Sequence, residues 1–343
     1  SYFNSCSNGG RQALMEAQRF PEDYDGIIAG APANYWTRLI VMGMSSMKAT
    51  LARPESYIPE KKLKAIQSVA VEACDARDGV KDGVIEQPDR CQPDYSRLLC
   101  SGAENDSCLT APQLEALKVV YAGPRNAKGA RVFPGISPGG EAEAGGWGGW
   151  VTGAAPKASA MFFFGTNFFQ NMVYGKPDWD FTTFDVDRDL KAAEEKTAAA
   201  LNATDPDLRR FAARGGKLIL YHGWCDAAIP AENTIDYWKS VEKKMGGKKT
   251  REFARLFLAP GVQHCAGGPR NGVTAENDLN AALERWVEQG VAPERLVAAK
   301  MKRGGGGVER TRPLCAYPLV AKYKGSGSTD EAANFECVPP PKR

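Results

Sequence analysis

Histidine is almost absent from this chain, since its 343 residues include only His222 and His264. This scarcity restricts the possible chemistry, because a serine hydrolase nearly always needs a histidine as its general base. Long apolar runs are also missing, and the aromatic-rich stretch SAMFFFGTNFF is too short to span a membrane. An excess of one charge is missing too: 44 basic and 41 acidic residues give a formal net charge of +3. We therefore expect neither a membrane nor a nucleic-acid partner.

The first residues, SYFNSCSNGGRQALMEAQRF, predict a strand, a sharp turn and then a helix from Arg11 to Phe20. This order is typical of a nucleophile elbow, which holds a serine above the end of a parallel sheet. The match to the G-x-S-x-G motif is incomplete, because Ser5 occupies the position of the first glycine, although Ser7 and Gly9 fit. The alternative interpretation is an ordinary turn followed by a helix N-cap.

Two further strand-like runs end next to residues that complete a catalytic set. Asp226 lies just beyond the apolar run Leu218–Tyr221, and His264 follows the run Leu256–Leu258 and a Gly/Pro loop. The chain order Ser7, Asp226, His264 is that of an α/β hydrolase and differs from the orders in chymotrypsin and subtilisin folds. We predict that Ser7 is the nucleophile, that His264 is its base and that Asp226 orients the imidazole.

A cysteine stands beside the predicted nucleophile and another beside the predicted base. If Ser7 and His264 touch, then Cys6 and Cys265 must also be close neighbours. A disulfide between them requires Cα atoms within about 4.4 to 6.8 Å, and closing so long a loop is worth up to about 5 kcal/mol of chain entropy. The alternative is a pair of buried free thiols.

These residues resemble the tannase and feruloyl esterase family, which includes bacterial mono(hydroxyethyl) terephthalate hydrolase. The hallmark of this family is a Cys-Ser pair, an aspartate and a His-Cys pair, in that order. In this chain Cys6-Ser7, Asp226 and His264-Cys265 match it. The resemblance continues through GGRQALMEAQRFPEDYDGIIAGAPA, LNATDPDLRRFAARGGKLILYHGWCDAAIP and RPLCAYPLVAKYKGSGSTDEAANFECV. It implies an α/β-hydrolase fold with a large inserted lid domain. It also implies a secreted or periplasmic esterase that cleaves esters of small aromatic acids.

The signals of a hydrolase core stop and restart along the chain. We assign residues 1–33 and 206–343 to the core, and the Gly-rich residues 34–205, with scattered helices, to the lid. An α/β hydrolase places several strands before its elbow, and a loop there donates one oxyanion-hole amide. Here the backbone N–H of Asn8 offers the other amide. Because the chain begins within the elbow strand, we expect it to be the C-terminal portion of a longer protein, whose N-terminal portion is missing or forms a separate subunit.

The nine cysteines indicate an oxidising compartment, because such a number is unusual in the cytosol. Sequence alone leaves many pairings open. The family resemblance implies three disulfides besides the one at the elbow. They are Cys74–Cys91, Cys100–Cys108 and Cys315–Cys337, which leaves Cys225 as a buried free thiol.

Three aspartates alternate with glycines in the stretch CDARDGVKDGVIEQPDRC. Their carboxylates would repel one another without a cation, and calcium prefers such oxygen ligands. The resemblance implies a structural calcium ion in the lid. Its ligands would be the side chains of Asp75, Asp78 and Asp82 and the carbonyls of Val80 and Val84. The alternative is a solvated acidic turn.

The predicted reaction is acyl transfer from an aromatic ester to Ser7, through an acyl-enzyme. His222 and Ile229 are the predicted substrate-binding residues, although a purely structural role explains His222 equally well. A group of lid phenylalanines would clamp the substrate ring or simply form apolar core; they are Phe162, Phe163, Phe164, Phe168 and Phe169. No residue distinguishes galloyl, feruloyl and terephthaloyl esters.

Two other classes of function stay open at this point. One is a non-catalytic calcium-binding module with a hydrolase fold that binds a carbohydrate or a protein. The other is a serine peptidase of the same fold, which would need an extended cleft rather than a small pocket under a lid.

Overall fold

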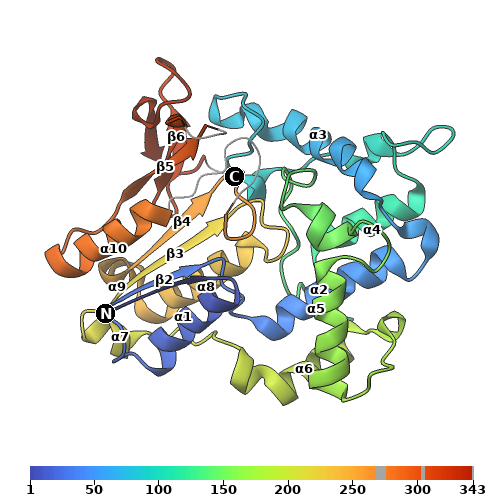
Figure 1. The fold of residues 1–343 in the computed structure, drawn as a ribbon, viewed down its shortest axis with the longest axis horizontal. Helices are drawn as coiled ribbons and strands as arrows, with labels where there is room; N and C mark the ends of the chain where they lie inside the picture. Colours follow the sequence, from blue (N-terminus) through green and yellow to red (C-terminus); the bar gives the residue numbers. More distant parts are fainter. Residues whose placement is uncertain (267–275, 303–305, 342–343) are drawn as a thin grey trace.

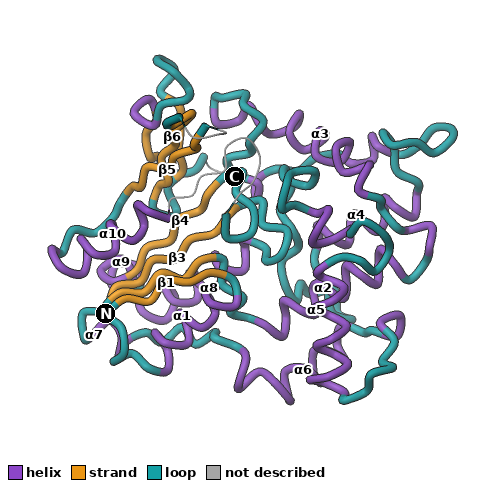
Figure 2. Tube along the Cα trace, viewed as in Figure 1, coloured by secondary structure: helices purple, strands orange, loops and turns teal. Residues whose placement is uncertain are grey.

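A four-stranded parallel sheet, with the strand order β1-β2-β3-β4, lies at the centre of the protein (Figures 1 and 2). The computed structural model describes residues 1–266, 276–302 and 306–341. The strands span Tyr2–Cys6, Gly26–Gly30, Lys217–Gly223 and Ala254–Ala259. The register pairs Cys6 with Gly30, and Gly223 with Ala259. The carboxyl ends of all four strands therefore meet at one edge of the sheet.

Helices cover both faces of this sheet because its strands bury side chains on both sides. Leu218 and Leu220 point into the hydrophobic cluster on one face, and Ile219 points into the cluster on the other. A parallel sheet buried on both faces is the usual arrangement in α/β proteins. The first face is covered by α1 (Asn8–Arg19), α7 (Arg209–Ala213), α8 (Ala231–Met245) and α9 (Gly247–Phe253), and the second by α10 (Glu276–Gln289).

The segment predicted as the lid is largely helical and lies beside the carboxyl edge of the sheet, coloured from blue at α2 through cyan and green to yellow-green at α6 in Figure 1. Helix α2 contacts α4, α5 and α6 and forms the middle of one hydrophobic cluster. That cluster also includes Ala227, Ala228 and Ile229 from the loop after β3, so the lid packs directly against this loop. Its helices are α2 (Trp36–Leu51), α3 (Leu63–Cys74), α4 (Ala111–Ala122), α5 (Ala160–Asn167) and α6 (Val186–Leu201).

Two antiparallel hairpins follow the core. The first pairs β5 (Arg295–Met301) with β6 (Val308–Cys315), and the second pairs β7 (Val320–Tyr323) with β8 (Phe335–Val338). Val80 of the acidic lid loop packs against Ala321 and Phe335 of the second hairpin. The C-terminal segment therefore braces the loop that is predicted to bind calcium.

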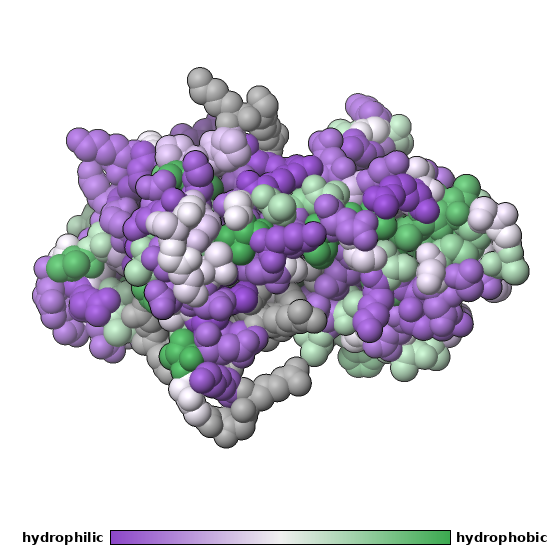
Figure 3. Space-filling model, turned by 90° about the horizontal axis from the view of Figure 1, so that it is seen from above, coloured by the Kyte–Doolittle hydropathy of each residue, from purple (hydrophilic) through white to green (hydrophobic). Residues whose placement is uncertain are grey.

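The face seen in Figure 3 is mostly hydrophilic, with hydrophobic patches between the polar residues. No helix in the described parts of the chain combines the length and the apolar character that crossing a membrane requires. The absence of a membrane partner stays a prediction from the sequence.

Candidate active site

The turn between β1 and α1 has the strained geometry of a nucleophile elbow. Ser7 adopts φ 65° and ψ −122°, a conformation that non-glycine residues rarely take. A Cβ atom on Gly9 would lie 1.9 Å from Ser5 Oγ, and one on Gly10 would lie 2.3 Å from the Gly30 carbonyl oxygen. Glycine is therefore required at both positions. Ser5 replaces the first glycine of the motif because the space opposite Gly9 accommodates its side chain.

The three predicted catalytic side chains form one hydrogen-bonded line. Ser7 Oγ lies 2.8 Å from His264 Nε2, and His264 Nδ1 lies 2.8 Å from Asp226 Oδ2. Although Ser7 is the N-cap of α1, its hydroxyl makes no capping bond to the helix. The hydroxyl is therefore directed at the imidazole, which can accept its proton.

Asp226 is fully buried and has a complete set of donors. Its Oδ1 accepts hydrogen bonds from the backbone N–H groups of Ala228 (2.8 Å) and Ile229 (2.9 Å). Burial alone would raise the pKa of Asp226, but attraction to His264 and hydrogen bonds from His222 and His264 outweigh it. These contacts hold the pKa of this carboxyl well below its ordinary value. The carboxylate therefore stays ionised and can orient the imidazole.

Several contacts hold His264 in place at the end of β4. Gln263, the preceding residue, donates from Nε2 to the Gly140 carbonyl of the lid at 2.7 Å. The indole of Trp150, also from the lid, meets the imidazole edge-to-face with ring centroids 5.1 Å apart. Cys265 is bonded to Cys6, with Cα atoms 5.9 Å apart. The base is thus fixed by both the core and the lid.

The disulfides follow the predicted pattern. Besides the bond at the elbow, Cys74–Cys91, Cys100–Cys108 and Cys315–Cys337 are all formed. Cys225 is free and buried, and burial raises the pKa of its thiol far above the ordinary value. Burial therefore disfavours the thiolate form of this cysteine.

A small apolar pocket opens directly at Ser7. Its volume is about 110 Å³, comparable to apolar cavities of about 150 Å³ that hold one benzene molecule. No charged residue is among those that line it. The lining consists of Ser7, Asn8, Ala33, Trp36, Leu39, Ile40, Met42, Gly43, Trp150, Met161, Phe164, Gly165, Ala228 and Ile229. Such a pocket suits one uncharged aromatic ring.

The predicted substrate-binding residues separate in the structure. Ile229 lines the pocket, whereas His222 is 0% exposed and is not part of the lining. Its ring nitrogens contact Thr234, Asp226 and the Ile229 carbonyl instead, which corresponds to the structural alternative.

The predicted group of lid phenylalanines also separates. Phe164 lines the pocket and is 44% exposed, whereas Phe163 beside it is 61% exposed and is not part of the lining. Phe168 and Phe169 are buried in the lid cluster. Sequence reasoning did not single out Trp36, Trp150 or Met161. Trp36 and Met161 are apolar residues of helices α2 and α5, Trp150 lies in a Gly-rich stretch, and neither setting carries a signal of a pocket.

The acidic loop, which contains Asp75, Asp78 and Asp82, has negative charge that a cation would neutralise, but its carboxylates do not point at one common position. Burial, and then the nearby carboxylates of Asp82 and Asp75, raise the pKa of Asp78 to about 6. Yet Asp82 Oδ2 is bound by Arg312 (2.7 Å) and Arg310 (2.9 Å). In the described residues no three acidic, histidine or cysteine side chains are placed to share a metal ion. The oxygen donors suit calcium chemically, and the calcium site stays a prediction.

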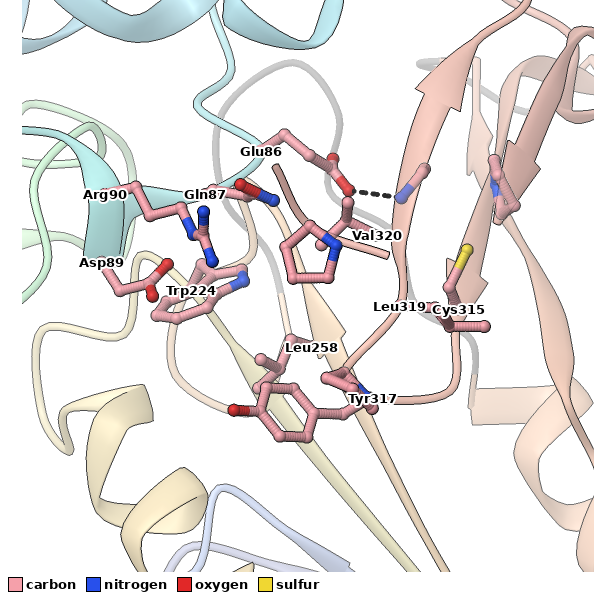
Figure 4. Close-up of a pocket in the computed structure, with 14 residues that line it drawn as sticks. Glu86, Gln87, Asp89, Arg90, Trp224, Leu258, Cys315, Tyr317, Leu319 and Val320 are labelled. Atoms are coloured by element: carbon pink, nitrogen blue, oxygen red, sulfur yellow. Dashed lines mark hydrogen bonds between the residues drawn. The ribbon is translucent and has the colours of Figure 1, made fainter. Parts of the chain in front are cut away.

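A larger hollow of about 1090 Å³ lies between the acidic loop and the second hairpin, away from the triad. It adjoins the smaller pocket of Figure 4, since Glu86 and Arg90 line both hollows, and Arg90 lies near Trp224 in this view. Burial raises the pKa of Glu86 to about 8, and the Ala321 N–H donates to its carboxyl at 3.1 Å. No serine or histidine is among the residues that line either hollow. We therefore place the active site at the pocket beside Ser7.

Comparison with known sequences gives a consistent set of relatives. A family model described as tannase and feruloyl esterase matches residues 1–338. An uncharacterized esterase of Xanthomonas campestris pv. campestris is 42% identical over 378 residues, covering 100% of this chain and 66% of that protein. A probable feruloyl esterase B of Aspergillus clavatus is 36% identical, covering 98% and 66% of the two chains. The chain thus spans about two thirds of the length of these curated relatives.

Solved structures give the same result for the fold. The crystal structure of feruloyl esterase B from Aspergillus oryzae superposes with a TM-score of 0.89 at 31% identity, covering 98% of this chain and 69% of that one. Tannin acyl hydrolase from Aspergillus niger gives a TM-score of 0.81 at 26% identity, covering 98% and 64%. Together with the parallel sheet and its covering helices, these likenesses confirm the predicted α/β-hydrolase fold.

Proposed function

This chain belongs to the tannase and feruloyl esterase family, and from that premise we propose that it is a serine-dependent carboxylic ester hydrolase for small aromatic acids. The observation that carries the proposal is the hydrogen-bonded set of three side chains. Ser7 Oγ lies 2.8 Å from His264 Nε2, His264 Nδ1 lies 2.8 Å from Asp226 Oδ2, and Ser7 lines an apolar pocket. Its relatives include proteins named feruloyl esterase and tannin acyl hydrolase.

In the first half of the reaction, Ser7 Oγ attacks the ester carbonyl carbon while His264 Nε2 takes the hydroxyl proton. The carbonyl oxygen becomes an oxyanion. Asn8 is the first residue of α1, so its N–H has no partner within the helix and can donate to that oxygen. No acidic residue lies in the first turn of α1, so the positive end of the helix dipole also favours the negative charge.

His264 then gives this proton to the leaving alkoxide, the alcohol departs, and the acyl group stays on Ser7. In the second half, His264 takes a proton from water while the water oxygen attacks the acyl carbonyl; the bond to Ser7 Oγ then breaks, His264 returns the proton to Ser7 Oγ, and the acid is released. Asp226 stabilises the imidazolium at each stage without accepting its proton. The edge of Trp150 shields the imidazole from one side, which limits its rotation between the two steps.

Aromatic esters should be hydrolysed much faster than methyl acetate, and Phe164→Ala should narrow this difference. The phenyl ring of Phe164 lines the pocket, so its loss should raise KM for methyl ferulate and methyl benzoate by about 3- to 10-fold. KM for methyl acetate should not change. The measurement is steady-state hydrolysis by the full-length gene product, using a panel of hydroxybenzoic and hydroxycinnamic methyl esters.

The neighbouring Phe163 provides the matched control. It is more exposed than Phe164 and contacts it edge-to-face, but does not line the pocket. Phe163→Ala should leave both KM values within about twofold. No turnover of any aromatic ester by the wild-type protein would refute the proposed function. Equal effects of the two substitutions would refute only the assignment of the pocket.

Neither of the other two functional classes has an observation in its favour. A non-catalytic module would have no need of the strained Ser7 backbone or of a serine bonded to a histidine. A serine peptidase needs a cleft that accepts several residues, whereas the pocket at Ser7 has room for about one ring. The four disulfides support action in an oxidising compartment, so we propose a secreted or periplasmic location.

We also propose that calcium binds the acidic loop through the side chains of Asp75, Asp78 and Asp82, with a structural role. Chelation should then lower Tm by about 5 °C or more, because a ligand that binds only the native state adds stability. Differential scanning calorimetry with EGTA and with added calcium measures this shift. Asp78→Asn should remove the response, and Asp178→Asn, an exposed lid aspartate, should preserve it. If the Tm of the wild type changes neither with EGTA nor with added calcium, the proposed calcium site is wrong.

A further inference from the structure

The second of the two histidines lies directly behind the acid of the triad. His222 is the sixth residue of β3 and is 0% exposed. Its Nε2 lies 3.1 Å from Asp226 Oδ2, the same oxygen that receives His264 Nδ1 at 2.8 Å. One carboxylate oxygen is therefore shared by the only two imidazoles of the chain.

The protonation of the buried ring follows from its partners. Nε2 faces two acceptors, Asp226 Oδ2 and the carbonyl oxygen of Ile229 at 2.9 Å. An imidazole nitrogen can satisfy an acceptor only if it carries a proton. The other nitrogen, Nδ1, lies 2.7 Å from Thr234 Oγ1, whose hydroxyl can donate to it. The contacts therefore select the tautomer with its proton on Nε2.

Counting donors shows what this contact contributes. A carboxylate has about four lone-pair directions, and Asp226 is fully buried. Two backbone N–H groups occupy Oδ1, from Ala228 and Ile229. His222 takes one direction of Oδ2, so the remaining one points at His264. Without His222, His264 would be the one remaining donor to Oδ2, and only the two bonds to Oδ1 would still oppose rotation of the carboxylate away from the base.

We infer that His222 is a positioning residue that fixes the rotamer of Asp226 and, through it, the direction of the catalytic imidazole. This inference rests on the proposed hydrolase function. Thr234, on α8, sets the tautomer of His222, and the bond to the Ile229 carbonyl ties the same ring to the residue whose side chain lines the pocket. His222 thus acts on the reaction without touching the substrate.

His222→Leu should lower kcat by about 10- to 100-fold, the usual effect of losing a hydrogen bond to a charged group. KM for methyl ferulate should stay within about twofold, because His222 does not line the pocket. His222→Gln, whose amide Nε2 can reach the same carboxylate, should restore kcat to within a few-fold of wild type. The assays use the full-length gene product. A rise in KM with little change in kcat would overturn the inference in favour of a substrate contact.

Thr234→Val tests the same chain of contacts without altering either histidine. Without the Thr234 hydroxyl, the proton of His222 can move from Nε2 to Nδ1. In that tautomer Nε2 has a lone pair facing Asp226 and no longer donates a hydrogen bond to it. kcat should fall by about 3- to 10-fold. Thr250 is the matched control, since it is also 0% exposed and its hydroxyl donates to the Gly246 carbonyl, far from the site. Thr250→Val should destabilise the fold to a similar extent and leave kcat unchanged. Equal loss of kcat in both variants would overturn the inference.

Nitrogen-15 NMR of the imidazoles provides a test that does not depend on activity. Comparing the spectrum of the full-length wild type with those of His222→Gln and His264→Gln assigns both rings. At neutral pH, His222 should show the proton on Nε2, and His264 should show it on Nδ1. A wild-type spectrum with the His222 proton on Nδ1 alone would overturn the inference even if the enzyme is active. An inactive wild-type protein with the expected tautomers would instead refute the hydrolase function.

Discussion

His264→Ala should lower kcat for aromatic esters by about 10⁴-fold or more, the largest effect we expect from any single substitution. His264 is the only imidazole of the chain that faces Ser7, because His222 is buried behind Asp226. Without it, no group takes the serine proton or protonates the leaving alkoxide. Steady-state kinetics on methyl ferulate gives the measurement, with Tm and circular dichroism to show that the variant is folded.

The serines of the elbow supply the controls for this prediction. Ser7→Ala should reduce kcat as strongly as His264→Ala, and the double variant should be no worse than either single one, because the two side chains act as a unit. Ser5→Ala changes the other serine of the elbow, two residues earlier, and should retain most of the activity. If Ser7→Ala kept substantial turnover while Ser5→Ala lost it, the assignment of the nucleophile would be wrong.

Breaking the Cys6–Cys265 disulfide should lower both stability and turnover. The bond joins residues 259 apart in sequence, so its chain-entropy contribution reaches about 5 kcal/mol. It also ties the residue before Ser7 to the residue after His264. The hydrogen bond between nucleophile and base is productive only near about 2.6 to 3.2 Å. Cys6→Ala and Cys265→Ala should each reduce kcat by about tenfold or more, with the double variant no worse than either.

The lid disulfide Cys100–Cys108 is the control for this prediction, because it joins residues only eight apart and none of the triad is next to it. Removing it should lower Tm and leave kcat close to wild type. Mass mapping of the non-reduced protein must also recover a peptide that links Cys6 to Cys265. Free thiols at both positions, in protein from an oxidising compartment, would exclude the proposed role.

The core strands and helices were predictable because their local patterns agree with their environment. Helix α8 is one example, because it shows one apolar face against the sheet. Helix α2 was not predicted, although it is the centre of the lid. Ten of its 16 residues are buried, on several sides of the helix. No polar face remains to reveal a period of 3.6 residues, so the pattern alone could not identify it.

The proposed catalytic residues could be named from the sequence for a different reason, namely that the chain offers so few choices. With two histidines, one of which follows a strand in the order expected of the fold, the base was nearly determined by composition. The pocket was not predictable, because its wall combines α2, α5, the loop that carries Trp150 and the loop after β3. Apolar side chains from four separate segments carry no local sign that they face a cavity rather than a core.

The sequence by itself was enough to propose Ser7, Asp226 and His264 as nucleophile, acid and base, to propose the cysteine pair beside them and to predict the class of fold, because each depends on a residue type in a fixed order along the chain. Only the tertiary structure decided the role of His222. Its four-residue spacing from Asp226 is compatible with a ring in the pocket or a ring behind the carboxylate. The second position follows from two contacts of the ring, one with Thr234 on α8 and one with the Ile229 carbonyl in the loop after β3. Hydrogen-bond partners brought together by packing, and not by spacing, place this histidine behind the acid.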